Sequence, residues 1–339
     1  MIEERDLDAA VAAGVLDAAT RERLVIFARQ HRLGAAGPDE EQFRLLTGFN
    51  DIFVTIAIGL LLTAIGTLIG SVSSLLGAAG VAAAAWGLAE YFTRRRRMAL
   101  PSIVLLLVFV AATFGTALML FTGSSSVNSV TGVPIGAVFA AGLAAAAAWA
   151  HWQRFMVPIT VAAGAGALVG MAVAATGVAA GTGNALLVTL LACGLAVFAL
   201  AMWFDTRDRA RVTRRTDVAF WLHLLAAPLI IHPVFSLAGL LAPDAGAGAA
   251  SIVVLVYIAL TLVALAIDRR ALLVSALVYV IYAIQALIKS GGLTADFGIT
   301  ALVIGVFLVG LSAAWRPIRS RVLALLPADM AARLPIAVA

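Results

Sequence analysis

The stretch that decides the fold is DVAFWLHLLAAPLIIHPVFSLAGLL, residues Asp217 to Leu241. It is an apolar run long enough to span a membrane, because a helix rises about 1.5 Å per residue and about 20 residues cross the hydrocarbon core. The run also carries two histidines. On a helix that begins at Asp217, His223 lies roughly 9 Å and His232 roughly 22 Å along the axis. Neither histidine is therefore expected at the membrane midplane.

The same run contains two prolines. Pro228 and Pro233 each remove a backbone donor, which frees the carbonyls of Leu224 and Leu229 and predicts a kinked helix. A freed carbonyl in lipid needs a partner, so the kinked side is expected to face neighbouring helices or a wet cavity. Two interpretations remain open: the histidines line such a cavity, or each forms a hydrogen bond to an adjacent helix near a membrane interface.

The composition of the whole chain excludes a soluble domain. Of 339 residues, 63% are hydrophobic and only 12% are charged, and the mean hydropathy is +1.06. Successive apolar runs of about 20 residues predict an all-α, polytopic transmembrane helix bundle. The formal net charge of +5 would suggest nucleic-acid binding in a soluble protein. Here the arginines lie in short turns between apolar runs, so they are interpreted as topology signals and no nucleic-acid partner is expected.

The apolar runs divide the chain into three regions. Residues 1–47 form a polar amino-terminal segment, residues 48–315 form a ten-span transmembrane bundle, and residues 316–339 form a cytoplasmic or interfacial tail. The ten spans are expected at residues 50–70, 72–92, 99–121, 131–150, 155–176, 184–204, 217–241, 250–267, 271–288 and 296–315.

The distribution of basic residues tests this span count. The chain has 23 arginine and lysine residues, and one of them is lysine, which leaves 22 arginines. With ten spans, all arginines fall in the amino-terminal segment, in alternate loops and in the tail, whereas Lys289 is the one basic residue of the other loops. Because cytoplasmic loops are rich in arginine and lysine, both termini are expected in the cytoplasm.

The amino-terminal segment is expected to form a helix pair. A helix from Ile2 to Ala13 ends at Gly14, and Asp17 caps a second helix that runs to about Leu33. The expected seam between the two helices consists of the apolar residues Val11, Val15, Leu16, Leu24, Phe27 and Ala28. The pair is interpreted as a cytoplasmic adapter or self-association element, or else it lies on the membrane surface.

Several segments carry a resemblance to a family. The helix pair around AAVAAGVLDAATRERLVIFAR, the entry FNDIFVTIAIGLLL, and the segments WGLAEYFTRRRRMALPSIVLL and DVAFWLHLLAAPLIIHPVF resemble an uncharacterised group of bacterial polytopic inner-membrane proteins. The resemblance covers most of the chain and contains no catalytic motif. It implies a bacterial cytoplasmic-membrane location and no established substrate.

A polar stripe marks the ninth expected span. Ser275, Tyr279, Tyr282, Gln285 and Lys289 are spaced three or four residues apart and share one helix face. Such a stripe either packs on another helix through hydrogen bonds or lines a water-accessible path. The candidate cavity-lining residues are therefore His223, His232, Ser275, Tyr279, Tyr282 and Gln285.

Other polar residues and glycines suggest structural roles. Glu90 lies four residues before Arg94, which favours an interfacial ion pair. Gly66 with Gly70, Gly132 with Gly136, and Gly166 with Gly170 have the spacing that permits close helix approach.

No catalytic residue, cofactor site or metal site is predicted. The single cysteine, Cys193, lies inside an apolar run, which excludes an intrachain disulfide and cysteine-ligated zinc. His223 and His232 point to opposed faces of one helix and cannot clamp one haem iron, and His31 and His151 are expected outside the core.

Three functions are compatible with the sequence. The first is a membrane scaffold or sensor that acts through a protein partner, or through self-association, at residues 1–47. The second is a secondary transporter with a small cavity between spans seven and nine. A membrane-embedded enzyme on lipid substrates is least favoured, because no convergent set of acid, base or metal ligands is seen near either interface.

The topology gives a direct prediction for labelling with a membrane-impermeant thiol reagent. Cysteines at Ser125, Gly181, Ala245 and Gly292 are expected to label from the periplasm, whereas cysteines at Thr93, Gln153 and Thr213 are not. The reason is the 22-to-1 distribution of basic residues. Labelling of two adjacent loops from the same side would contradict the span count between them.

Overall fold

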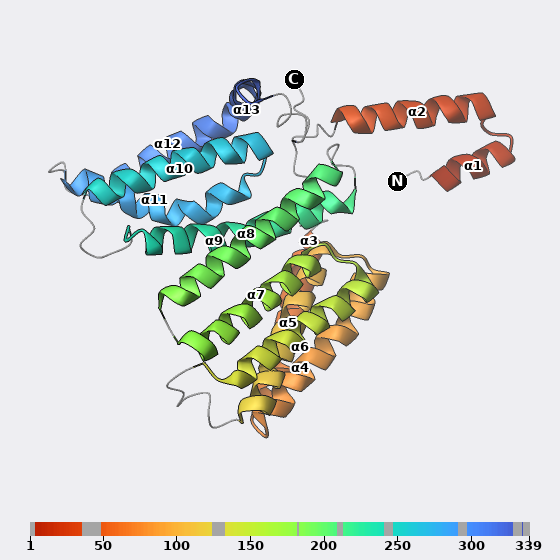
Figure 1. Ribbon diagram of the computed structural model, residues 1–339. Helices are drawn as coiled ribbons and strands as arrows, with labels where there is room; N and C mark the ends of the chain where they lie inside the picture. Colours follow the sequence, from red (N-terminus) through yellow and green to blue (C-terminus); the bar gives the residue numbers. More distant parts are fainter. Residues whose placement is uncertain are drawn as a thin grey trace. The chain divides into compact units, whose positions relative to one another are not determined.

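A computed structural model describes the backbone of residues 4–35, 49–123, 133–181, 183–208, 213–240, 247–290, 297–327 and 334. Side chains 4–6, 27–35, 271, 275, 289, 290 and 297 lie outside the description. All elements in these ranges are helices (Figure 1). The chain divides into an amino-terminal unit that ends at Phe43 and a second unit that runs from Arg44 to Pro335.

The amino-terminal unit contains α1 (Glu4–Ala12) and α2 (Ala18–Ala35). Gly14 adopts a left-handed conformation with φ of 69°, which ends α1 without the steric cost of a side chain. Asp17 accepts hydrogen bonds from the backbone N–H and the hydroxyl of Thr20, and these bonds hold the pKa of Asp17 below its usual value. The predicted stop and cap are thus confirmed.

An ion pair joins the two helices, and the predicted apolar seam is only partly formed. Arg21 Nη2 lies 2.8 Å from Asp8 Oδ1. Val15 is 80% exposed and Leu24 is 41% exposed, so both differ from the expected seam. The side chains of Phe27 and Ala28 lie outside the described part of the chain.

The second unit consists of helices at all the positions where spans were expected. They are α3 (Phe49–Gly70), α4 (Ser74–Ala89) with its π-helical extension η1 (Glu90–Arg95), α5 (Ala99–Thr122), α6 (Ile135–Phe155), α7 (Ile159–Ala180), α8 (Asn184–Arg207), α9 (Arg214–Leu237), α10 (Ala247–Ile267), α11 (Ala271–Ser290), α12 (Phe297–Ala313) and α13 (Trp315–Ala324).

Eight of the described helices, α3 to α10 with η1 counted as part of α4, are long and apolar enough to cross a membrane. A ninth candidate is the pair of α12 and α13, which bends by 71° at Ala314. The apolar part of α11 is shorter. Large apolar side chains cover the outside of this unit: Leu60 is 69% exposed and Leu302 is 66% exposed. An outer surface of this kind suits lipid, so the membrane assignment is supported by helix length and by surface chemistry.

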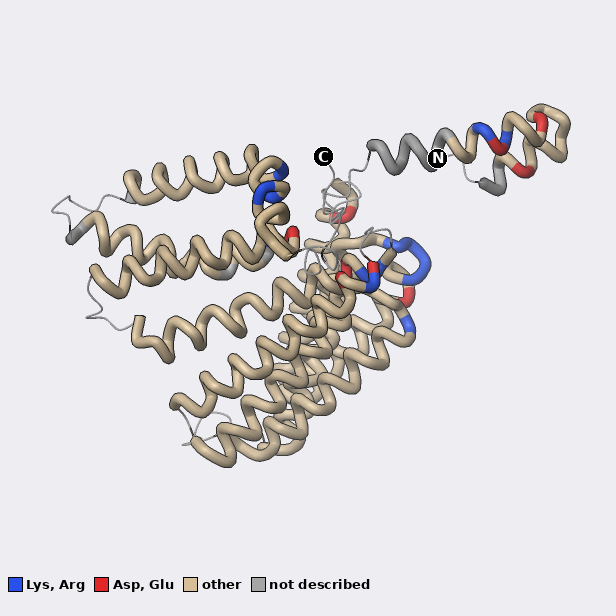
Figure 2. The backbone as a smooth tube through the Cα atoms, turned by 45° about the horizontal axis from the view of Figure 1, so that its top comes forward, with Lys and Arg blue, Asp and Glu red and all other residues tan. Residues whose placement is uncertain are grey.

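Charged residues gather at one end of the second unit. Figure 2 shows the coloured arginines and carboxylates of this unit gathered at one end, while the described residues of the opposite end carry no colour. This grouping follows from the alternation of arginine-rich turns along the sequence. Within the described residues, the charges of the unit therefore lie at one end, which we call the charged end.

Helix α9 lies at the centre of the second unit. It packs against α7, α8 and α11. Its residues Val218, Leu222 and Ala226 belong to a core cluster with α7 and α8, whereas Ile231 and Phe235 belong to a second cluster with α10 and α11. Helix α9 thus connects the two halves of the bundle.

The prolines do not interrupt α9. Both Pro228 and Pro233 lie inside the continuous helix. Pro233 is buried, but Pro228 lies on an exposed side of α9. The expectation that the Pro228 side faces the bundle is therefore not met.

Glycines permit close helix contacts at some of the predicted positions. A Cβ at Gly136 would lie 2.9 Å from Phe121 Cβ. A Cβ at Gly77 would lie 2.7 Å from Gly70 Cα. Gly170 has open space around it, so the 166–170 spacing does not mark a close approach. Among the described glycines, Gly194 of α8 approaches α9 most closely, and an added Cβ there would lie 2.8 Å from the carbonyl carbon of Leu229.

The tail after residue 316 contains a helix. It begins as helix α13, which packs against α10. Trp315 and Arg319 are each only 2% exposed. These two side chains hold the start of the tail in the second unit.

Replacement of Gly194 by alanine is expected to lower the thermal stability of the detergent-solubilised protein. The new methyl group meets backbone at α9, and overpacking of this kind costs about 1–3 kcal/mol. Gly170→Ala is the matched control. It has open space and is expected to leave stability unchanged or to raise it by up to about 1 kcal/mol through helix propensity. Equal melting temperatures for the two variants would contradict the close α8–α9 contact.

Candidate functional site

A buried ionic cluster lies at the charged end of the bundle. Asp205 is two residues before the end of α8, His223 lies in α9, and Arg269 lies in the turn between α10 and α11. His223 Nε2 is 2.8 Å from Asp205 Oδ2, and Arg269 Nε donates to the same oxygen at 3.2 Å. Arg269 Nη2 donates to Asp205 Oδ1, which makes the arginine–carboxylate contact bidentate. We call these three residues the ionic cluster.

The side chains of the ionic cluster are buried from solvent. Arg269 and His223 are 0% exposed and Asp205 is 2% exposed. The positive guanidinium and the negative carboxylate neutralise each other, and the arginine also donates to the carbonyl of Thr216 at 3.4 Å. A buried pair of this kind is tolerated only when its hydrogen bonds are made inside the protein. The cluster therefore ties three separate elements together at one point.

A second buried group extends this end of the bundle to α13. Asp268 Oδ1 accepts a hydrogen bond of 2.8 Å from Trp315 Nε1 and lies 3.7 Å from Arg319 Nε. Arg319 Nε also donates to the carbonyl of Leu265 at 3.2 Å. Asp268 has a left-handed φ of 57°, which aspartate tolerates better than most residues. In the tight turn between α10 and α11, Asp268 thus binds to α13, whereas the adjacent Arg269 binds to α8.

Asp208 organises the start of α9. Its Oδ2 accepts hydrogen bonds from the backbone N–H of Thr213 at 2.9 Å and from the hydroxyl of Thr216 at 3.0 Å. Thr213 in turn caps α9 by accepting from the N–H of Arg215. These bonds fix the first turn of α9 close to the end of α8.

Glu90 forms the predicted pair and one more. Its Oε2 lies 3.4 Å from Arg94 Nη1, which confirms the pair along the helix. Its Oε1 also accepts a bond of 2.6 Å from Arg154 Nε at the end of α6. Sequence spacing could not show the second partner, because it lies 64 residues away.

His151 is buried, contrary to the expectation that it lies outside the core. It is 0% exposed, and its ring lies against Trp86, Phe109 and Phe155 at centroid distances of 4.5–6.0 Å. Its Nδ1 is 3.4 Å from the hydroxyl of Thr160. The side chain of His31 lies outside the described residues.

The two histidines of α9 make separate contacts. His223 belongs to the ionic cluster, whereas His232 Nδ1 lies 2.8 Å from the hydroxyl of Tyr279 on α11. The ring of Tyr279 also packs edge-on against Phe235, with 5.1 Å between centroids. Each histidine thus bonds to an adjacent helix, which is the second of the two interpretations drawn from the sequence.

The predicted polar stripe of α11 is split. Tyr279 faces α9, but Tyr282 is 68% exposed and points away from the helices around it, contrary to the expectation that it lines an interior space. Gln285 is half-buried. The side chains of Ser275 and Lys289 lie outside the described part of the chain. The structure therefore places His232 beside Tyr279, and it places Tyr282 on the exposed surface.

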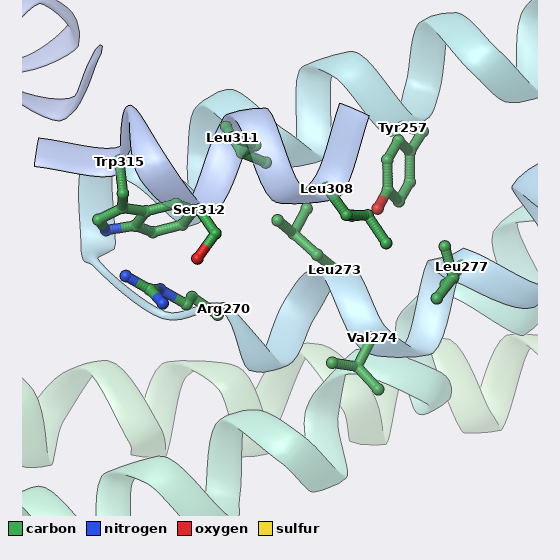
Figure 3. Close-up of a pocket in the computed structure, with 9 residues that line it drawn as sticks. All are labelled: Tyr257, Arg270, Leu273, Val274, Leu277, Leu308, Leu311, Ser312 and Trp315. Atoms are coloured by element: carbon green, nitrogen blue, oxygen red, sulfur yellow. The ribbon is translucent and has the colours of Figure 1, made fainter. Parts of the chain in front are cut away.

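A pocket lies elsewhere in the same half of the bundle. Figure 3 shows it among α10, α11, α12 and the start of α13, with Tyr257, Arg270, Val274, Ser312 and Trp315 in its lining. The described candidates His223, His232, Tyr279, Tyr282 and Gln285 do not line it.

The chemical abilities of the ionic cluster are limited by its burial. Its side chains are at most 2% exposed, so a substrate has no route to them without a rearrangement. Among the described residues, no group of three or more histidine, cysteine, aspartate or glutamate side chains could hold a metal ion. The arrangement suits a structural role, in which the cluster links α8, α9 and the α10–α11 turn.

The sequence interpretation missed Asp205, Asp268, Arg269 and Arg319. The arginines were assigned to topology alone, because an arginine in a short turn usually meets water or lipid headgroups. The position of Asp205 could have predicted its pairing. It lies at the end of an apolar run, where an acidic side chain usually binds a partner inside the protein.

Comparison with known proteins does not extend these findings. No protein-family model, curated protein or solved structure matches the chain.

Replacement of Asp205 by asparagine is expected to destabilise the protein strongly. It leaves the buried charge of Arg269 without its carboxylate, and breaking a buried pair costs about 3–5 kcal/mol. The measurement is the fraction of detergent-solubilised protein that stays monodisperse after heating.

The matched control is Glu90→Gln, which removes a carboxylate whose side chain is 33% exposed to solvent. Its loss of stability is expected to be much smaller, because water solvates the arginines left behind. Equal losses for the two variants would contradict a special role for the ionic cluster.

Proposed function

We propose that this chain is a ten-span protein of the bacterial inner membrane, with both termini in the cytoplasm, which acts as a scaffold or sensor through its amino-terminal helix pair. The observation that carries the proposal is the apolar surface of that pair. Val15, Leu24 and Ile26 are 80%, 41% and 48% exposed, respectively. Exposed apolar side chains on a short soluble helix pair favour contact with a partner.

The topology part of the proposal is supported by charge and helix positions. Helices α3 to α12 occur at the ten expected spans. The arginine-rich turns gather at one end of the second unit in Figure 2. With ten spans, both termini would lie on the arginine-rich side, which the positive-inside rule assigns to the cytoplasm.

The internal chemistry of the bundle supports an anchoring role. The charges of Asp205 and Arg269 are neutralised inside the protein, and His223 bonds to the same carboxylate. A site that moves ions or solutes needs polar groups that a ligand can reach. The buried ionic cluster instead fixes helix positions, as an anchor for a cytoplasmic element requires.

A secondary transporter with a cavity between spans seven and nine is the second candidate. The contact of His232 with Tyr279 favours it, because it places two titratable side chains between α9 and α11. An enzyme acting on lipids has weaker support, since the described acids and histidines that lie close together are held in buried pairs or caps.

A photo-crosslinking amino acid at Leu24 of the full-length protein in its native membrane tests the proposal. A crosslink to a second copy or to another protein is expected, because this exposed apolar side chain would lie in the partner contact. The matched control is position Arg23, which is exposed on the same helix and polar. Absence of any protein crosslink at Leu24, or equal crosslinking at Arg23, would contradict the proposal.

The transporter alternative predicts a different measurement. Purified protein in liposomes would catalyse proton flux or solute uptake, and His232→Ala would abolish it. The scaffold or sensor proposal expects no flux above that of empty liposomes.

A further inference from the structure

We propose that the pocket of α10, α11 and α12 binds an anionic phospholipid, with the phosphate of the headgroup at Arg270 and an acyl chain along the apolar wall. The pocket has a volume of about 140 Å³. This site goes beyond the proposed function and does not depend on it, because a scaffold, a sensor and a carrier could each hold such a lipid.

The walls of the pocket suit an acyl chain. They are formed by the apolar side chains Leu273, Val274, Leu277, Leu308 and Leu311. Val274 is 62% exposed, so the pocket opens to the outer surface of the bundle, which faces the bilayer in the proposed topology. A lipid could enter from the membrane and leave part of its tail in the surrounding bilayer.

The charged end of the pocket suits a phosphate. Arg270 lines this end, and Figure 3 shows its guanidinium beside the hydroxyl of Ser312, with both groups directed to the same space. Arg270 and Ser312 are exposed. Within the described residues, Arg270 makes a stacking contact with Trp315, 4.8 Å from the guanidinium carbon to the ring centroid. The stacked guanidinium keeps N–H donors at its edge that match phosphate oxygens.

The nearby carboxylate of Asp268 binds other side chains, so the positive charge of Arg270 is available to a ligand in the pocket. Asp268 lies close in sequence, but its carboxylate accepts from Trp315 Nε1 and pairs with Arg319. The same bond to Asp268 fixes the indole of Trp315, so the ring holds Arg270 at the pocket. A basic pocket between transmembrane helices on the cytoplasmic side is a known way to bind anionic lipid headgroups.

The depth of the pocket defines the orientation of the lipid. Figure 3 shows Tyr257 at the opposite end from Arg270 and Trp315. Its hydroxyl is buried and has no hydrogen-bond partner among the described residues. With the phosphate at Arg270, this hydroxyl lies at the level of the acyl chain, so the headgroup does not need it.

Native mass spectrometry of the full-length protein in detergent tests the site, with phosphatidylglycerol and zwitterionic phosphatidylethanolamine as probes. The wild-type protein is expected to retain phosphatidylglycerol in preference. Arg270→Gln should lower its apparent affinity about tenfold, which corresponds to the loss of one charge-assisted hydrogen bond. Val274→Trp, which fills the mouth of the pocket, should do the same with Arg270 intact.

Three control variants distinguish the site from general surface effects. Arg321→Gln removes an exposed arginine of α13. Val278→Trp adds the same bulk at a 55%-exposed position of α11 outside the pocket. Tyr257→Phe removes the deep hydroxyl. All three are expected to change retention of phosphatidylglycerol less than twofold.

Four results would overturn the proposal. The first is equal retention of the two lipids by the wild-type protein. The second is a loss in Arg321→Gln as large as that in Arg270→Gln, which would show surface electrostatics. The third is unchanged binding in Val274→Trp. The fourth is a loss in Tyr257→Phe that equals the loss in Arg270→Gln.

Discussion

Asp205 accepts hydrogen bonds from both His223 and Arg269 where bulk solvent does not reach, and the arrangement of the bundle depends on this interaction. The three residues come from α8, α9 and the α10–α11 turn. Because an unpaired charge cannot be left in such a space, the three elements have to meet at one point. The close approach of α8 and α9 at Gly194 then continues that contact into the apolar part of the helices.

The charged end of the second unit and the apolar length of its helices are held together by different interactions. At the charged end, carboxylates bind arginines, tryptophan and threonine through bonds that are specific in direction. Along the apolar length, small residues and large aliphatic side chains pack without such direction, as in the clusters that α9 shares with its neighbours. Within a bilayer, apolar packing alone discriminates weakly between helix arrangements, since lipid is equally apolar. The ionic contacts therefore provide much of the specificity of the arrangement.

Much of the fold could be predicted from the sequence, because apolar length and arginine alternation report directly on helix position. The Gly14 stop, the Asp17 cap and the Glu90–Arg94 pair are local features, and local spacing predicted them. The partners of Asp205, Asp268 and Glu90 at Arg269, Trp315 and Arg154 are 47 to 64 residues away. Helical periodicity gives the face of a residue but not the helix that lies opposite. For that reason Tyr282 was expected inside and is exposed. His151 was expected outside the core because the predicted span ended at residue 150, whereas α6 continues to Phe155.

The most direct test of the account is a double-mutant cycle between Asp205 and Arg269. The free energies of unfolding of Asp205→Asn, Arg269→Gln and the double variant would be measured in the same detergent. If the two side chains form one buried pair, the double variant is less destabilised than the sum of the single variants, with a coupling of about 2–3 kcal/mol. Additive losses would show that the two residues act independently, and would contradict the claim that their pairing holds α8 to the α10–α11 turn.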